Sequence, residues 1–239
     1  MCGRFVSASP PDQIARYFDA AAPEALLEPS YNVAPTNDVY AVLADGGVRR
    51  VDAFHWGLVP VWAKDPKVGA RMINARAETL AEKNAYKPAF RRRRCLIPAD
   101  GFYEWRKVPG QKQKQPYYIT RTDGEPLVFA GLWEVWKPKG ASGEPTGEEL
   151  RSCTIITTSA NETMRPVHDR MPVILPPSAW DEWLDPGNDD IETLGKLLVP
   201  APPQLIRLTP VSTLVNNVRN KGPELIEPAP EPATLDGLG

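Results

Sequence analysis

The stretch Cys95-Leu96-Ile97-Pro98-Ala99-Asp100-Gly101-Phe102-Tyr103-Glu104-Trp105 places two short apolar runs on either side of a turn signal. Short runs of apolar and aromatic residues between Pro, Asp and Gly are typical of β-strands. The same pattern recurs along the chain, and further strands are expected at residues 38–43, 48–59, 117–120, 127–136, 153–158, 172–175 and 205–211. The sequence therefore predicts many short strands.

Helix signals are few by comparison. Helices are expected after Ser9-Pro10-Pro11-Asp12, over residues 76–86, after a Ser178 cap, and over residues 191–198. Many short strands and 27 prolines argue against a doubly wound α/β fold. We predict an α+β protein with a single compact domain, built on a curved, mainly antiparallel sheet or barrel-like core with a few short helices.

The domain is expected to span residues 1–227. Residues 137–149 are rich in Pro, Gly and Glu, which favours an exposed hairpin insertion. Residues 228–239 form a Pro/Ala/Glu tail without a packing pattern, so a disordered C-terminus is predicted.

Composition excludes several classes of protein. The net charge of −2 does not suit a globally basic nucleic-acid coat, although four arginines occur together at 91–94. That run fits either a focused polyanion site or a solvated surface. Three scattered cysteines and two histidines offer neither a disulfide framework nor a zinc site. With no signal peptide and no apolar run of membrane length, we expect an intracellular, cytoplasmic protein.

The N-terminal residues Met1-Cys2-Gly3-Arg4-Phe5 carry a chemical possibility. If Met1 is removed, Cys2 has a primary amine and a thiol on adjacent carbons. This pair can condense with an aldehyde to a Schiff base and close to a thiazolidine ring, or act as a nucleophile with its own base. The alternative is that Cys2 is a small residue packed in a core.

Four further residues stand in unusual settings. Asn74 begins a polar junction, where it is either a site residue or a helix cap. Glu104 lies between aromatics, where burial would raise its pKa and suit it to acid/base work, unless it faces solvent. His168 has charges of both signs beside it and is either a site residue or a satisfied loop histidine. Trp62 could stack on an unpaired base.

Eight motifs occur in order between residue 1 and about residue 227. They are Met1-Cys2-Gly3-Arg4-Phe5, Tyr31-Asn32-Val33-Ala34-Pro35, Trp56-Gly57-Leu58-Val59-Pro60, Asn74-Ala75-Arg76-Ala77-Glu78-Thr79, the stretch from Cys95 to Trp105, Phe129-Ala130-Gly131-Leu132-Trp133, His168-Asp169-Arg170-Met171-Pro172, and Pro210-Val211-Ser212 with Asn217. Together they resemble the SOS-response-associated peptidase family, or SRAP domain.

The resemblance implies a protein that crosslinks itself to abasic sites in single-stranded DNA. Cys2 would be the nucleophile, Asn74 would hold the N-terminus or the opened sugar, and Glu104 and His168 would move protons. The residues expected to contact DNA are Arg4, Trp62, Arg76, Arg91 and Asn217. The family name fits self-removal of Met1. No cofactor, metal or membrane is implied, and we expect a monomer, associated with the nucleoid if the source is bacterial.

Two other functions remain open at this stage. An N-terminal-nucleophile amidohydrolase of the glutamine amidotransferase kind can also begin Met-Cys-Gly, and it would release ammonia from glutamine. A non-catalytic single-strand DNA-binding module would never link covalently to its ligand.

Overall fold

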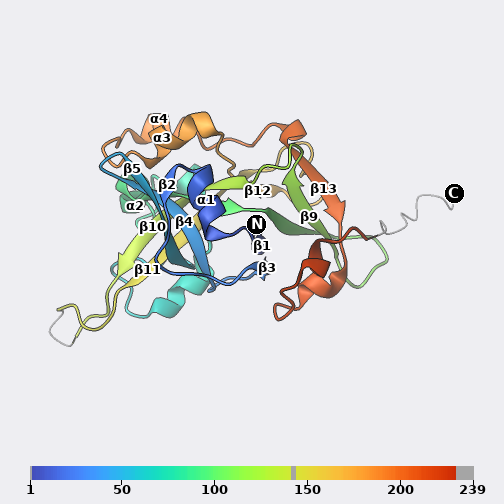
Figure 1. Ribbon diagram of the computed structural model, residues 1–239, viewed down its shortest axis with the longest axis horizontal. Coiled ribbons are helices and arrows are strands. Elements are labelled where there is room, and N and C mark those ends of the chain that lie inside the picture. Colours follow the sequence, from blue (N-terminus) through green and yellow to red (C-terminus); the bar gives the residue numbers. More distant parts are fainter. Residues whose placement is uncertain (1, 141–143, 230–239) are drawn as a thin grey trace.

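The computed structural model describes residues 2–140 and 144–229, and it folds into two mainly antiparallel sheets with short helices (Figure 1). The first sheet has the strand order β13-β9-β8-β1-β3, formed by Ile206–Pro210, Gln115–Arg121, Gly101–Arg106, Phe5–Ser7 and Ser30–Val33. The second has the order β12-β11-β10-β7-β4-β5-β2, formed by Arg170–Pro172, Leu150–Ser159, Leu127–Trp136, Arg94–Ala99, Asp38–Asp45, Val48–Trp56 and Ala20–Ala21.

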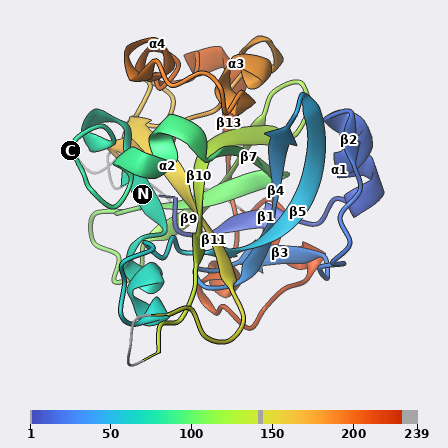
Figure 2. The same cartoon turned by 90° about the vertical axis from the view of Figure 1, so that its left-hand side faces the viewer.

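The second sheet closes on itself. Besides pairing with β10, strand β11 pairs in parallel with β5, where Ser152 lies opposite His55 and Cys153 opposite Trp56. The ring β11-β10-β7-β4-β5 is thus a small barrel, and Figure 2 shows these strands curving around one another. A short strand β6, Asn74–Arg76, adds in parallel to the outer part of β11. The predicted α+β fold on a curved, barrel-like core is confirmed.

Side chains alternate between the two faces of the barrel strands, and they form two separate hydrophobic clusters. On β7, Cys95 and Ile97 pack in a cluster that includes Phe5 of β1 and Phe102 of β8. Leu96 points to the other face, where it joins a cluster with the helices. The helices are α1 (Pro11–Tyr17), α2 (Lys87–Arg92), α3 (Trp180–Leu184) and α4 (Ile191–Lys196). The barrel therefore presents one face to β1 and β8, and that face adjoins the site described below.

One predicted helix is wrong. Residues 76–86 were expected to be helical up to Pro88, but Asn74–Arg76 is a strand and only Ala77–Thr79 forms a single 3₁₀ turn. Pairing with β11 holds the start of this segment extended. Pro88 lies in the first turn of α2, which begins at Lys87, instead of ending a helix, because the first turn of a helix needs no backbone N–H from proline.

Most other predicted elements agree with the structure within a few residues, including β4, β5 and β10. Ser178 makes no capping hydrogen bond, and α3 follows a 3₁₀ turn at Pro177–Ala179. The first two residues of the predicted tail are ordered by backbone contacts, since Pro228 forms a bridge with Val211 and the Ala229 N–H donates to the Pro210 carbonyl. Residues 230–239 of that tail, and residues 141–143 of the predicted hairpin insertion, lie outside the described residues.

Two glycines in contact fix the path of the chain after β5, where it leaves the barrel. Gly57 has φ +141°, and a Cβ built on it would lie 2.5 Å from the backbone oxygen of Gly69. A Cβ on Gly69 would meet the backbone oxygen of Gly57 in turn. The contact holds the turn Pro66–Arg71 against the end of β5, and the Trp56 indole N–H donates to the Ile73 carbonyl at 3.0 Å. These contacts set the position of Asn74.

None of the helices formed by the described residues has the length and apolar run that a membrane crossing requires.

Candidate functional site

Cys2 lies immediately before β1 and is completely buried. Its carbonyl oxygen accepts a 2.7 Å hydrogen bond from the Asn74 side-chain amide, so β6 holds the start of the chain against the barrel. Burial raises the pKa of the Cys2 thiol, and the nearby charge of Glu104 raises it further. The thiol is therefore protonated at neutral pH.

Glu104 reaches the same place from β8. Strands β1 and β8 pair antiparallel with Phe5 opposite Phe102, and the Tyr103 N–H donates to the Arg4 carbonyl at 2.9 Å. Since side chains alternate along a strand, Glu104 shares the face of Phe102, toward the core that contains Cys2. Burial raises the pKa of Glu104 to about 7, against the opposing positive charges of the N-terminus and Lys114. This carboxyl can both donate and accept a proton near neutral pH.

His168 approaches from the loop that leads into β12. The backbone N–H of Arg170 donates to Nδ1 at 2.9 Å, which leaves the proton of a neutral ring on Nε2. Burial and the positive N-terminus lower the pKa of His168, and Asp169, 2.8 Å from Nδ1, opposes them. We therefore take the ring as neutral, with Nε2–H as its donor.

Glu104 and His168 open onto one pocket of about 480 Å³. Its other lining residues are Arg4, Trp105, Lys114 and Asn216. Cys2 lies beneath this pocket, close enough for the Glu104 charge to affect the thiol. Residues far apart in the sequence on β1, β6, β8 and the β12 loop thus converge on the N-terminus. Within the described parts of the chain, no three His, Cys, Asp or Glu side chains are grouped as metal ligands would be.

The candidate DNA contacts are spread more widely. Arg4 lines the pocket, but its Nη1 already donates to Asn32 Oδ1 at 2.7 Å and to the Val215 carbonyl at 3.0 Å. Arg76 is exposed and lies on the same face of β6 as Asn74, two residues away. Trp62 is 60% exposed and lines a separate open depression with Asn84, Lys87 and Pro88.

The four-arginine run divides between the surface and the interior. Arg91 is exposed at the end of α2, and Arg92 lies 3.6 Å from Asp189. Arg93 pairs with Glu134 at 2.7 Å. Arg94 is buried and donates five hydrogen bonds to backbone carbonyls at the ends of α2 and α3 and in the loop that follows. The run is thus not one basic surface, and Arg94 is not available to DNA.

Sequence reasoning missed three pocket residues, namely Trp105, Lys114 and Asn216. The Trp105 indole N–H donates to Asn216 Oδ1 at 2.7 Å, and the guanidinium of Arg4 lies 5.8 Å from the Trp105 ring centre. The Asn217 side chain accepts from the Arg219 N–H and shapes the loop, and its contact with DNA stays a prediction. The sequence signal for Trp105 was its position next to Glu104. Lys114 lies in a loop whose sequence has no pattern that indicates a site residue.

Comparison with known sequences decides the family. Residues 1–218 match the family described as SOS response associated peptidase (SRAP). The chain belongs to the SRAP family. This SRAP chain is similar to the abasic site processing protein YoqW of Bacillus subtilis (strain 168), with 45% identity over 229 residues that cover 95% of this chain and 99% of YoqW. It is 34% identical over 236 residues to the abasic site processing protein YedK of Escherichia coli (strain K12), covering 95% and 100% of the two chains.

A vertebrate SRAP relative and solved structures extend the comparison. The abasic site processing protein HMCES of Xenopus tropicalis is 37% identical over 227 residues, which cover 82% of this chain and 65% of HMCES. A protein from Bacteroides thetaiotaomicron superposes with a TM-score of 0.82 at 24% identity over 95% of this chain and 100% of its own, which shows a shared fold. A phage-related protein from Bordetella bronchiseptica gives a TM-score of 0.67 at 31% identity, covering 88% of this chain and 94% of its own.

Proposed function

We propose that this protein forms a covalent crosslink with abasic sites in single-stranded DNA through Cys2, once Met1 has been removed. The names of the relatives at 34–45% identity support a role at abasic sites. The observation that carries the chemistry is the convergence of Glu104, His168 and Asn74 on Cys2 beside an open pocket. The crosslink would cover the lesion during the response to DNA damage.

The order of bond formation follows from the pKa values. An abasic sugar is mostly a closed hemiacetal, and opening it moves a proton from the C1′ hydroxyl to the ring oxygen. Glu104, with a pKa of about 7, can relay this proton, and the His168 Nε2–H can hydrogen-bond the released oxygen. Because burial keeps the Cys2 thiol protonated, the amine is the first nucleophile.

Amine attack on the aldehyde gives a carbinolamine, and a proton from Glu104 to its hydroxyl group releases one water and leaves a protonated imine. Sulfur then bonds to C1′ while the thiol proton passes to the Glu104 carboxylate, which restores the neutral carboxyl and leaves a neutral ring N–H. The sum is an aldehyde plus an aminothiol giving a thiazolidine and water. Asn74 would hold Cys2 in place through its carbonyl while both atoms react.

The DNA strand would lie along the pocket and the neighbouring basic side chains. Arg76, which is exposed, and Arg4 would contact phosphates, and Trp62, which is 60% exposed, would stack on a base. Removal of Met1, by the protein itself or by an aminopeptidase, must come first, so intact mass is expected to show Cys2 as the first residue of active protein.

A denaturing gel tests the proposal and separates it from its rivals. Oligonucleotides with and without one abasic site are incubated with wild-type protein, and a heat-stable shifted band is expected only with the abasic strand. Cys2→Ala should lose the band and keep non-covalent binding, while Cys2→Ser should give a labile product. Cys153→Ala, a change of another buried cysteine, is the matched control and should still crosslink.

Unchanged crosslinking by Cys2→Ala would overturn the assignment of the nucleophile. Ammonia release from glutamine would favour an amidohydrolase, and binding without any covalent product would favour a simple single-strand binding module.

A further inference from the structure

A second cavity lies at the far end of the strands that carry the reactive groups. The chain runs from Cys2 and Arg4 into β1, which ends at Ser7, and β8 runs back from Gly101, next to Asp100, past Glu104. Ser7 and Asp100 line this cavity, which shares no lining residue with the pocket beside Cys2. Five residue steps of an extended strand separate Cys2 from Ser7, a span of roughly 17 Å. The two pockets can therefore be occupied at the same time.

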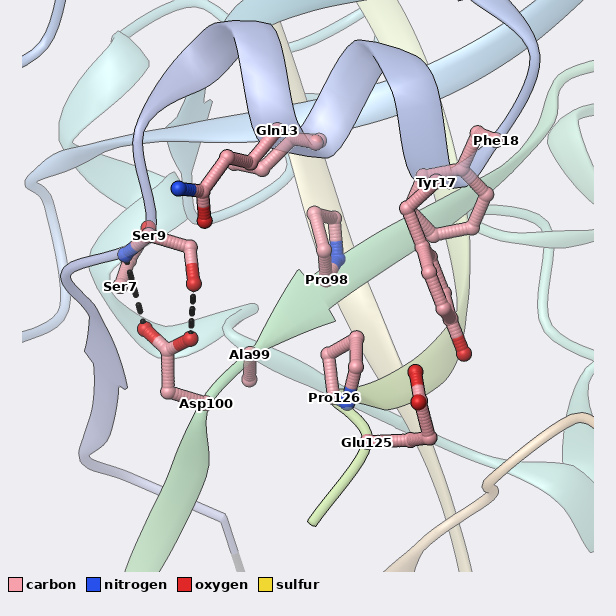
Figure 3. A pocket seen from close by; sticks show the side chains of 11 residues that line it. Ser7, Ser9, Gln13, Tyr17, Phe18, Pro98, Ala99, Asp100, Glu125 and Pro126 are labelled. Carbon is pink, nitrogen blue, oxygen red and sulfur yellow. Dashed lines mark hydrogen bonds between the residues drawn. The ribbon is translucent and has the colours of Figure 1, made fainter.

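The cavity is built on a rigid frame (Figure 3). One wall comes from α1, through Ile14, Tyr17 and Phe18, and the floor comes from Pro98, Ala99 and Pro126. The Asp100 carboxylate fastens the exit of β1 by accepting from the Ala8 N–H at 2.6 Å, the Ser9 N–H at 3.1 Å and the Ser9 hydroxyl. The volume of the cavity is about 220 Å³. Pockets for whole ligands measure about 300–1,000 Å³, so this cavity suits a single side chain.

The charge at the mouth of the cavity determines which kind of side chain can bind there. The Glu125 carboxylate lies beside the Tyr17 hydroxyl (Figure 3). Burial raises the pKa of Tyr17, the positive charge of Arg121 lowers it, and the charges of Glu125 and Asp123 raise it. Among the described residues, Glu125 has no ion pair, and the adjacent Arg121 is already paired with Asp123 through two hydrogen bonds of 2.9 and 2.5 Å. This rim repels phosphate and attracts a cation with an apolar stem.

We propose that this cavity is a docking site for an arginine side chain of a partner protein. The methylene groups would pack on Pro98, Ala99 and Pro126, and the guanidinium would meet the Glu125 carboxylate and the Tyr17 hydroxyl. Arginine fits better than lysine because its guanidinium is planar, weakly hydrated and able to bind a carboxylate through two hydrogen bonds. Arginine is also common among the residues that dominate interfaces. The partner would be held while Cys2, which precedes the other end of β1, reacts with DNA.

The probe is N-acetyl-arginine N-methylamide, titrated into the full chain and followed by the NMR signals of the Ser9, Gln13 and Gly101 amides. Saturable shifts of these signals are expected, with N-acetyl-citrulline N-methylamide, the neutral isostere, binding at least about tenfold more weakly. Glu125→Gln should weaken the arginine probe by a similar factor, whereas Glu24→Gln, a change of an exposed glutamate outside the cavity, should not. Equal binding of both probes, an unchanged Glu125→Gln variant, or shifts confined to other residues would overturn the proposal.

The result is independent of the DNA chemistry. Glu125 lies outside the pocket beside Cys2, so Glu125→Gln should crosslink abasic DNA at the wild-type rate. Slower crosslinking by this variant would contradict the separation of the two pockets.

Discussion

At the scale of single residues, Glu104 shows how a group suited to proton transfer lowers the stability of the folded protein. A carboxyl that is only 4% exposed is held in its neutral form until about pH 7, because burial outweighs the nearby positive charges. The same desolvation that prepares it for proton transfer makes the charged form unfavourable in the folded state. A residue suited to chemistry is therefore a residue that weakens the protein.

Glu104→Gln should remove this penalty. The unfolded carboxyl titrates near 4.5 and the folded one near 7, so between these values the folded state binds more protons and stability falls as pH rises. Relative to the variant, the wild type should lose about 3 kcal/mol of unfolding free energy between pH 4 and pH 8. Urea unfolding at several pH values measures the difference, and crosslinking by the variant should be ~10²–10⁴-fold slower. Curves that stay parallel at every pH would contradict the assigned pKa.

Lys114 is a residue whose role can be separated from that of its neighbours. It lines the pocket beside Cys2, and its charge lowers the pKa values of Glu104 and His168. Lys114→Ala should weaken binding to any single-stranded sequence and flatten the log–log salt dependence by ~0.7, as expected for one lost phosphate contact. It should also move the pH dependence of crosslinking to higher pH. Lys112→Ala, in the same loop, is the control; equal effects of both changes would point to general charge alone.

At the scale of elements, one ion pair connects two parts of the site. It links the turn after β6, the strand whose Asn74 binds the Cys2 carbonyl, to the residues next to His168. Glu78, just after β6, accepts two hydrogen bonds from Arg170 at 2.7 and 2.9 Å. The Arg170 guanidinium also donates to the Thr157 carbonyl at 2.7 Å, while its backbone N–H fixes Nδ1 of His168. Glu78 is thus a positioning residue that acts through Arg170.

Glu78→Gln should loosen this connection and slow crosslinking, by up to ~10²-fold if His168 moves by about 1 Å. Stability should change by less than about 1 kcal/mol because the carboxylate is half exposed. The ¹⁵N NMR signals of His168 should show mixed tautomers, a readout that a merely structural pair would not move. Glu192→Gln, which removes the carboxylate 3.8 Å from Lys196 on α4, should leave both rate and spectrum unchanged.

The elements also show where sequence reasoning succeeds and fails. Runs such as 127–136 were predicted correctly because apolar residues between turn signals have few alternatives to a strand. The wrongly predicted helix 76–86 begins at a residue held in β6, whose parallel pairing with β11 is a long-range contact with no local signature. Tertiary pairing overrode local preference there.

At the scale of the whole molecule, the site forms where β1 and β8 of the open sheet meet the barrel. The sequence could indicate that Cys2, Asn74, Glu104 and His168 were unusual, and the order of motifs indicated the family. It could not supply Lys114 and Asn216, which reach the pocket only through strand register and loop packing. The sequence also could not show which arginines of residues 91–94 are exposed. In the structure Arg91 is exposed at the end of α2, whereas Arg94, at the start of β7, is buried.

Arg94 links distant parts of the molecule and should be essential for stability. Arg94→Met removes the donor from the buried carbonyls of Phe90 and Trp183 and from the half-buried carbonyl of Asn188, and each buried group left unpaired costs about 1–3 kcal/mol. A loss of at least about 3 kcal/mol in urea unfolding is expected, with normal crosslinking by the molecules that remain folded. Arg92→Met, whose side chain is 65% exposed, is the matched control and should stay close to wild type. Equal stability of the two variants would contradict this role.

The contact between Gly57 and Gly69 has a consequence for how the gene tolerates mutation. Neither residue can gain even a methyl group, because each Cβ would strike the backbone of the other, so no single substitution is neutral and no compensating partner change is open to either codon. In a saturation library selected for survival of abasic damage, both codons should lose every non-glycine variant. Gly195, where an added Cβ meets nothing within 4 Å, should accept alanine freely. Depletion at 57 and 69 would then mark two inherited constraints set by backbone packing, at residues that touch no reacting group.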